Sequence, residues 1–357
     1  MAIASVEVVP YALPFREPYV TARGTLHRRE MVLLRLRADD GSEGIGEAVP
    51  LALRGGASLA EISAQLRRFG DQISDAGSGS QSARFAAELM RLSAPGRCAV
   101  LTAWLDLAGH SHGVPAWRLL GAESAAPVRC NATLTQAEPL HVAQQALAWE
   151  AEGFSTFKLK LGGPADTETV EMVRQALGPE ARIRVDANGA WDVERAAEVL
   201  GGLEEAGLEL AEQPVASLEE MAELSGRTRI PLAADESVSS PDDALRAAKL
   251  GACTYATVKL SKVGGHADAR GIAARLPVYL SSALDGPVGI AAAAHVAQVI
   301  NEDGEDPGLA HGLATQRLFG ETIAARGCEL DRDMLHLPEG PGIGVAIDET
   351  ALRRHRL

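Results

Sequence analysis

The feature that most constrains the fold is a regular alternation of apolar and amphipathic segments that begins near residue 128. Short apolar runs are separated by longer stretches rich in Ala, Glu and Leu, which are typical of helices. The runs lie at 128–134, 156–161, 182–187, 208–212, 231–235, 256–260 and 277–281, with a weaker eighth near 309–313. Strand–helix alternation predicts a parallel sheet, and near-continuous apolar strands fit a sheet covered on both faces. Eight such units predict an α/β fold with a closed (β/α)8 barrel of the TIM type.

The alternative architecture is an open, doubly wound sheet. A dinucleotide-binding sheet of that kind carries a G-x-G-x-x-G fingerprint after its first strand. The glycines at Gly41, Gly44 and Gly46 lie in a predicted hairpin and lack that spacing. The closed barrel is therefore favoured.

The segments on either side of the barrel have a different character. Residues 30–38 alternate apolar and charged side chains, as a half-exposed strand does, and the Asp40-Gly41 turn predicts a hairpin. Helical stretches follow, so residues 1–125 are expected to form a small α+β domain. The barrel would then occupy 126–320. The tail at 321–357 leaves the repeat pattern, and we expect it to pack back on the first domain.

Composition limits the partners that this chain can have. The formal net charge of −14 argues against nucleic acid, because phosphate binding needs a basic face. The four cysteines are scattered, which favours a reducing, cytoplasmic location. Residues 1–10 do not resemble a signal peptide, and no uncharged apolar stretch reaches the ~18 residues of a membrane span. A homo-oligomer is compatible with the sequence.

One charged residue recurs near the end of five successive predicted strands. These residues are Lys160, Asp186, Glu212, Asp235 and Lys259, and they are spaced by 23 to 26 residues. Each interval is one strand–helix unit, so all five side chains should lie at the C-terminal rim of the barrel. Active sites of this fold lie at that rim.

The three acidic residues of this set predict a metal site. Converging carboxylates without Cys or His suit a hard divalent cation, so we expect Asp186, Glu212 and Asp235 to bind Mg²⁺, for which Mn²⁺ could substitute. The alternative is that each forms an ordinary salt bridge at a strand end. An ordinary salt bridge could explain any one of these residues. It explains less well why five charged residues recur at the same position of successive strands.

Lys158 and Lys160 form a K-L-K motif, and residues two apart in a strand point to the same face. Two ammonium groups on one face, beside a metal, should lower each other's pKa. A lysine tuned in this way can act as a general base. The alternative is a pair of solvent-facing lysines on an edge strand.

Other polar residues close to the rim are expected to assist. Arg184 precedes Asp186 by two residues and should share its inward face, where it either binds a substrate carboxylate or pairs with Asp186. Asn188 and Glu236 follow metal candidates and are expected to orient ligands or lysines.

At these residues the chain resembles the enolase superfamily, in its muconate-lactonizing-enzyme subgroup. The motifs are K-x-K at 158–160, D-x-N at 186–188, E-Q-P at 212–214, D-E-S at 235–237 and V-K-L-S-K-V-G-G at 258–265. The resemblance covers nearly the whole chain. It implies Mg²⁺ on Asp186, Glu212 and Asp235, with Lys160 and Lys259 facing each other across a small carboxylate substrate. It also implies that residues 21–25 lie in a mobile capping loop.

Within the subgroup, the closest resemblance is to the o-succinylbenzoate synthases of menaquinone biosynthesis. It rests on N-A-T at 131–133, S-S-A-L-D-G-P-V-G-I-A at 281–291 and H-G-L-A-T at 311–315. It implies a lyase that dehydrates its substrate, with Lys160 as base and Lys259 as electrostatic partner. Asn131, Ser281 and Ser282 are expected to bind substrate.

Other reactions of the subgroup remain open. They are N-acylamino acid racemisation, dipeptide epimerisation and muconate cycloisomerisation. Residues 309–313 lack the D-x-D motif that dipeptide epimerases usually carry. The intact set of five rim charges argues against a non-catalytic binding protein.

Overall fold

The computed structural model describes residues 2–21, 24–51, 55–74, 81–301 and 306–357. Seven parallel strands form one sheet in chain order from β5 to β11. Their bounds are β5 (Ala132–Leu134), β6 (Thr156–Lys160), β7 (Arg182–Asp186), β8 (Leu210–Glu212), β9 (Leu232–Ala234), β10 (Tyr255–Val258) and β11 (Val278–Leu280). Each of these strands overlaps one of the predicted apolar runs.

Two residues close the sheet into a barrel. His311 forms a parallel bridge with Cys130, just before β5, and Gly312 forms one with Ser281, just after β11. The Gly312 N–H donates to the carbonyl oxygen of Leu280 at 2.8 Å. The weak eighth apolar run is therefore a very short strand, and the predicted (β/α)8 barrel is confirmed.

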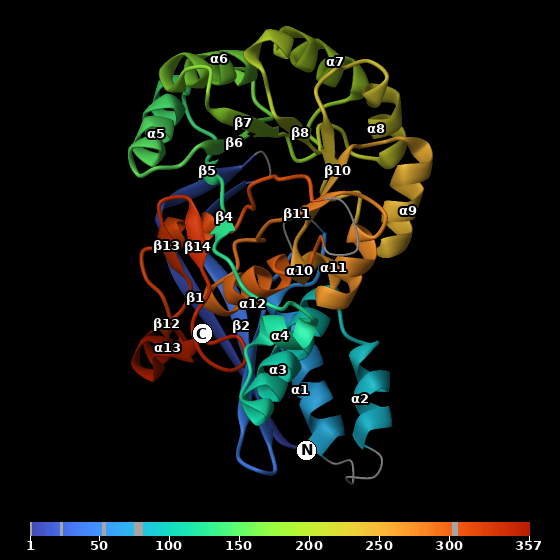
Figure 1. Cartoon of the computed structure of the whole chain (residues 1–357), viewed down its shortest axis with the longest axis vertical. Coiled ribbons are helices and arrows are strands. Elements are labelled where there is room, and N and C mark those ends of the chain that lie inside the picture. The colour runs from blue at the N-terminus through green and yellow to red at the C-terminus, as the bar shows by residue number, and fades with distance from the viewer. Residues whose placement is uncertain (1, 22–23, 52–54, 75–80, 302–305) are drawn as a thin grey trace.

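Helices cover the outside of the barrel, and Figure 1 shows the first five as an arc around the strands. They are α5 (Pro139–Ala151), α6 (Asp166–Leu177), α7 (Val193–Gly202), α8 (Leu218–Ser225), α9 (Pro241–Leu250), α10 (Leu260–Val263), α11 (His266–Ala273) and α12 (Pro287–Ala297). The largest hydrophobic core lies between these helices and the strands. The strands are apolar on both faces except where inward side chains carry charge.

The N-terminal part is an antiparallel sheet of β1 (Ile3–Thr21), β2 (Gly24–Ala38) and β3 (Glu43–Ala48). Its helices are α1 (Leu59–Ser74), α2 (Gln81–Leu89), α3 (Ala94–His112) and α4 (Ala116–Leu120). Helix α3 lies directly on β3, and a Cβ on Gly46 would lie 1.9 Å from the carbonyl oxygen of Ala99. The glycines of this hairpin therefore permit helix–strand contact.

Strand β2 is more deeply buried than its alternating pattern predicted. Val32 and Leu34 pack in a cluster with α1 and α3, whereas Met31 and Leu33 pack in a second cluster with the C-terminal segment and α12. The half-exposed strand was expected because charged residues alternate with apolar ones. Arg35 is nevertheless 8% exposed, because it pairs with Glu349 of the tail.

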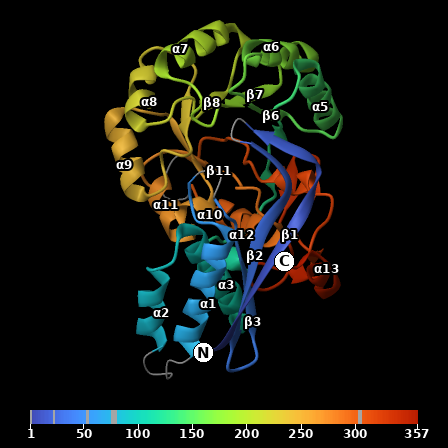
Figure 2. The same ribbon diagram turned by 180° about the vertical axis from the view of Figure 1, so that it is seen from behind.

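Strands β1 and β2 form a long hairpin that extends from the N-terminal part up to the barrel (Figure 2). In the predicted loop at 21–25, the described residues belong to strands: Val20 pairs with Thr25 and Thr21 with Gly24. Residues 22–23 of that loop lie outside the described residues. The carbonyl oxygen of Val20 accepts from the N–H of Gln136, in the segment after β5, at 3.3 Å.

The C-terminal segment returns to the N-terminal part, as expected. It forms β12 (Ala324–Arg326), β13 (Glu329–Asp331), β14 (Met334–His336), β15 (Ala346–Ile347) and α13 (Glu349–His355). The Leu357 N–H donates to the carbonyl oxygen of Pro10 at 3.0 Å. Strand β14 pairs with β4 (Val128–Arg129), so the first predicted barrel run is split between a small antiparallel sheet and β5. The boundaries at 125 and 320 remain predictions. None of the helices in the described ranges is both long and apolar enough to cross a bilayer.

Candidate active site

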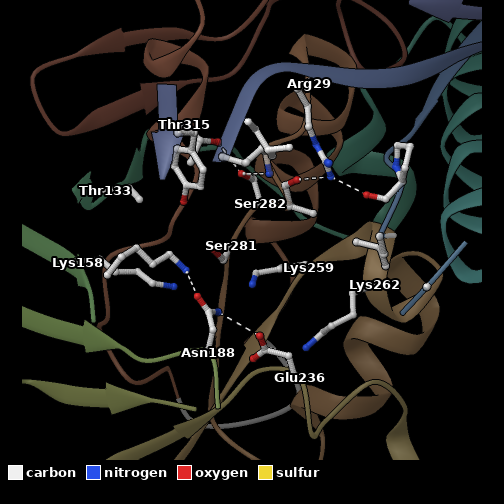
Figure 3. A pocket seen from close by; sticks show the side chains of 18 residues that line it. Arg29, Thr133, Lys158, Asn188, Glu236, Lys259, Lys262, Ser281, Ser282 and Thr315 are labelled. Atoms are coloured by element: carbon white, nitrogen blue, oxygen red, sulfur yellow. Dashed lines mark hydrogen bonds between the residues drawn. The ribbon is translucent and has the colours of Figure 1, made fainter. Parts of the chain in front are cut away.

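A cavity of about 220 Å³ lies at the C-terminal rim of the barrel, under the β1–β2 hairpin. Five cationic side chains and one acidic side chain line it, namely Arg29, Lys158, Lys160, Lys259 and Lys262 with Glu236. In Figure 3, Lys158 and Lys259 approach from different sides of the cavity. Asn188 lies next to Glu236, below the two lysines in this view. The apolar residues of the lining are Tyr19, Leu26, Pro50, Leu51 and Leu284.

The predicted metal ligands end neighbouring strands at the same level. Lys160 is the register partner of Asp186, and Asp186 is that of Glu212. Asp235 follows β9 directly, and all three carboxylates are at most 1% exposed. Parallel register therefore brings together three acidic groups that the sequence separates by more than 20 residues each.

The lysines pair with these carboxylates. Lys160 Nζ lies 2.6 Å from Oδ2 of Asp186, and Lys158 Nζ lies 2.8 Å from the same oxygen. Lys158 also donates to Glu212, and Lys259 donates to Asp235. The lysines at 158, 160 and 259 thus compensate the buried negative charge, which would otherwise be highly unfavourable.

The pKa directions follow from this pairing. Burial lowers the pKa of Lys158, but the charges of Asp186 and Glu212 outweigh burial and hold that pKa well above its usual value. Burial raises the pKa of Asp186, but Lys158 and Lys160 hold it well below its usual range. The pKa of Glu212 is raised by burial and by Asp186. The sequence predicted that neighbouring ammonium groups and a metal would lower the pKa of a lysine here; around Lys158 the carboxylates of Asp186 and Glu212 act in the opposite direction.

The donor set fits a hard cation in its chemistry. Oε1 of Glu212 is buried without a hydrogen-bond partner among the described residues, and oxygen ligands from Asp and Glu are those that Mg²⁺ prefers. As they stand, no three Asp, Glu, His or Cys side chains in the described ranges are grouped as a metal site. The ammonium groups of Lys158, Lys160 and Lys259 hold carboxylate oxygens that a cation would share.

Asn188 and Glu236 lie where the sequence placed them. The Asn188 N–H donates to Oδ1 of Asp186 at 3.0 Å, and its side-chain oxygen accepts from Lys160 at 3.0 Å. Its Nδ2 donates to Glu236 at 3.1 Å. Asn188 has a φ of 51°, a left-handed conformation that turns the chain sharply after β7. An orienting role for both residues remains a proposal.

Gln213 supports the site by hydrogen bonds to the segment after β9, a role that the sequence did not predict. Its Oε1 accepts from the N–H of Asp235 at 2.8 Å and from Ser237. Its φ of 38° turns the chain immediately after Glu212. It therefore ties the end of β8 to the end of β9. The E-Q-P motif was the available signal.

Ser281 and Ser282 line the cavity, as predicted for substrate binding. The hydroxyl oxygen of Ser282 lies 2.5 Å from that of Thr315, which comes from the segment after the eighth strand. The Leu284 N–H donates to the Ser282 hydroxyl at 3.2 Å. Ser281 and Ser282, which precede α12, thus form a polar edge to the cavity together with Thr315.

Two predicted substrate-binding residues do not reach the cavity. Arg184 is fully buried, pairs with Glu209 and donates to the carbonyl oxygen of Ala310 at 2.6 Å. It lies two residues before Asp186, hence about 6.6 Å deeper in the barrel. Arg184 thus pairs with Glu209 and not with Asp186, and its role in substrate binding stays a prediction.

Asn131 is also fully buried, and its Nδ2 donates to the carbonyl oxygen of Ala132 at 2.9 Å. Thr133, two residues later on the same face, lines the cavity instead. Asn131 therefore lies deeper along the strand than the cavity, and its contact with substrate stays a prediction.

Several lining residues were missed. Lys262 donates to Oδ1 of Asp235 at 2.9 Å, and its signal was the K-x-x-K spacing after Lys259. Arg29 donates to the carbonyl oxygens of Pro50 and Ala283 at 2.7 and 2.8 Å, and so links the N-terminal part to the barrel (Figure 3). The sequence predicted a capping loop at 21–25, but it gave no signal for Arg29.

Two family profiles match the chain. "Mandelate racemase / muconate lactonizing enzyme, N-terminal domain" matches residues 3–121, and "Enolase C-terminal domain-like" matches 141–351. Among curated relatives, muconate cycloisomerase 1 of Rhodococcus opacus is 31% identical, over 99% of this chain and 98% of its own. L-Ala-D/L-Glu epimerase of Clostridium acetobutylicum is 28% identical, over 97% and 99%.

A third relative, o-succinylbenzoate synthase of Thermobifida fusca, is 38% identical over 54% of this chain and 62% of its own length. Among solved structures, muconate lactonizing enzyme of Pseudomonas fluorescens with muconolactone has a TM-score of 0.92, with 28% identity over 100% and 99% of the two chains. Dipeptide epimerase of Cytophaga hutchinsonii with Mg and D-Ala-L-Val has a TM-score of 0.91, with 27% identity over 99% and 98%.

Proposed function

We propose a reaction for this chain on the premise that it belongs to the enolase superfamily, with the N- and C-terminal domains of its mandelate racemase and muconate lactonizing branch. The shared step is removal of a proton from the carbon next to a carboxylate. The proposed reaction is dehydration of a cyclohexadiene dicarboxylate to o-succinylbenzoate, which is a step of menaquinone biosynthesis. The observation that carries the common step is the pairing of lysines with three buried carboxylates at one rim.

A bound Mg²⁺, held by Asp186, Glu212 and Asp235, would stabilise the negative charge that develops on the substrate carboxylate. Lys160 would take the α-proton on its Nζ and then give it to the departing hydroxyl, which leaves as water. Lys259, on the other side of the cavity, would stay protonated and stabilise the developing charge. Lys158 would hold Asp186 and Glu212 in place.

The chemistry of the cavity wall favours a substrate with two carboxylates and an apolar body. Five cations face one acidic group in the lining, and Glu236 already accepts from Asn188. The Tyr19, Leu26 and Leu284 side chains offer an apolar surface to a ring. An α-ammonium group, as in a dipeptide, would meet mainly positive charge there. Ser281 and Ser282 are proposed to bind the second carboxylate.

A second candidate function is racemisation of an N-acyl amino acid. It needs one acid/base lysine on each side of the α-carbon, and Lys160 and Lys259 both line the cavity. Muconate cycloisomerisation is a third reading, since a full-length relative carries that name. Dipeptide epimerisation is less favoured because of the cationic lining.

The test is a Mg²⁺-dependent assay of the purified chain in D₂O with four substrate classes. These are the cyclohexadiene precursor of o-succinylbenzoate, N-acyl amino acids, dipeptides and cis,cis-muconate. We expect turnover of the cyclohexadiene precursor, lost with EDTA and restored with Mg²⁺. Deuterium exchange at the α-carbon of an N-acyl amino acid, with no dehydration of the precursor, would reject the dehydratase in favour of the racemase.

A further inference from the structure

Tyr279 lies in β11 with its side chain inside the barrel, below the cavity that the lysines line. It is fully buried and packs with Leu210 and Ala233 in the apolar layer of the lower barrel. A buried phenol hydroxyl is unfavourable unless it finds hydrogen-bond partners. The hydrogen-bond partners of this hydroxyl therefore indicate a role for Tyr279 beyond core packing.

The Tyr279 hydroxyl lies between one acceptor and one donor. It donates to Oε2 of Glu212 at 2.7 Å and accepts from Oγ1 of Thr257 at 2.7 Å. The direction follows because an ionised carboxylate only accepts, so the Thr257 hydroxyl must be the donor. The guanidinium carbon of Arg184 lies 4.8 Å from the centroid of the Tyr279 ring. Arg184 therefore contacts the ring of Tyr279, and two hydrogen bonds fix its hydroxyl.

The two carboxylate oxygens of Glu212 have different surroundings. Oε2 receives both Tyr279 and Lys158, whereas Oε1 is buried and has no hydrogen-bond partner among the described residues. A buried, ionised oxygen without a donor is unfavourable unless a cation binds it. Oε1 is thus the oxygen with which Glu212 would reach an ion.

Lys158 by itself holds Glu212 less firmly than the pair of donors does. Its ammonium is shared with Oδ2 of Asp186, at 2.8 Å. The Tyr279 hydroxyl has a single carboxylate partner, and its ring is fixed within the barrel. The Tyr279 hydroxyl therefore adds a restraint on the Glu212 carboxylate to the one that Lys158 shares between Glu212 and Asp186.

We propose that Tyr279 is a positioning residue for the divalent cation: its hydroxyl fixes the Glu212 carboxylate so that Oε1 faces the ion. The inference rests on the proposed function only in taking Glu212 as a ligand of that ion. Groups that orient a metal ligand typically contribute about 10- to 100-fold to metal affinity. Tyr279 reaches the ion only through Glu212.

The variant Tyr279→Phe removes the hydroxyl and keeps the ring. Isothermal titration of the full chain with MgCl₂, without substrate, should give a Kd about 10-fold or more above that of the wild type. Far-UV circular dichroism should confirm that the variant is folded. The matched control is Tyr255→Phe, the same change on a tyrosine packed against the same layer, and it should bind Mg²⁺ as the wild type does.

Equal Mg²⁺ affinity in folded Tyr279→Phe and in the wild type would overturn the inference while leaving the proposed function intact. No Mg²⁺ binding by the wild type would contradict the proposed function and this inference with it. If Tyr279→Phe does not fold, Thr257→Val decides, because it removes the donor that orients the Tyr279 hydroxyl. Weaker Mg²⁺ binding by that variant supports the inference, and unchanged binding rejects it.

Discussion

Individual charged residues define the site, and each is buried to a degree that charged groups rarely reach. Lys160 is 8% exposed and Asp186 is fully buried, yet the pair is stable because their charges lie within hydrogen-bond distance. Breaking one buried pair usually leaves an uncompensated charge. Here Lys158 also contacts Asp186, so that the carboxylate keeps a partner if Lys160 is removed.

The variant Lys160→Ala should therefore remain folded and lose turnover. A general base typically contributes 10²- to 10⁴-fold, so we expect kcat to fall at least ~100-fold in steady-state assays with the substrate proposed above. The matched control is Lys249→Ala, an exposed lysine on α9, which should keep full activity. Near-normal kcat for Lys160→Ala would exclude Lys160 as the base.

At the scale of elements, one contact joins the N-terminal sheet to the first turn of α12. Glu47, in β3, accepts from the N–H of Gly286 at 2.6 Å and from the hydroxyl of Tyr11 at 2.7 Å. The first N–H groups of a helix lack partners within the helix, and an acidic group stabilises that end. Burial, and then the charge of Asp285, raise the pKa of Glu47 to about 7.

This raised pKa predicts a pH dependence of stability. The native state binds the Glu47 proton more tightly than the unfolded chain, whose ordinary pKa is 4.5. Binding of this proton therefore stabilises the native state fully below pH 4.5, and this stabilisation is lost as the pH rises through about 7. Its size is about 3 kcal/mol in the free energy of unfolding, because one pKa unit corresponds to about 1.4 kcal/mol.

The variant Glu47→Gln should remove this pH dependence, since an amide does not titrate here. Its side-chain oxygen can still accept from Gly286, and its N–H₂ can donate to Tyr11. Urea unfolding between pH 5 and pH 8 should give a flatter profile for Glu47→Gln than for the wild type. An exposed change, Glu204→Gln, should leave the profile as it is. Parallel profiles for Glu47→Gln and the wild type would contradict the assignment.

At the scale of the whole molecule, Asp106 connects three distant segments. From α3, its Oδ2 accepts from the N–H of Ile45 in β3 at 2.8 Å, and its Oδ1 accepts from the N–H of Ile343 in the C-terminal segment at 2.7 Å. Ile343 belongs to the same apolar cluster as Tyr11 and Met31 of the N-terminal sheet. The tail is therefore held by both a polar and an apolar contact.

Asp106→Asn keeps the shape and one acceptor oxygen but leaves one of the two backbone N–H groups without its acceptor. A buried donor left unsatisfied costs about 1 to 3 kcal/mol, so urea unfolding should show a loss of that size. Asp71→Asn is the same change at an exposed position of α1 and should be neutral. Unchanged stability of Asp106→Asn would show that the tail is held by its apolar contacts alone.

The sequence by itself determined the barrel and the rim position of Lys160, Asp186, Glu212, Asp235 and Lys259. The reason is local: each unit repeats the same strand and helix, so residues at strand ends meet at one rim whatever the packing details. Only the tertiary structure decided how deep Arg184 and Asn131 lie, because strand periodicity gives the face of a residue and leaves its layer open. It also decided the roof of the cavity, where Tyr19 and Arg29 arrive from a hairpin more than 100 residues away in the chain. Only the tertiary structure decided the direction of the Lys158 pKa shift as well, because that shift depends on distances to charges that are fixed only in the folded barrel.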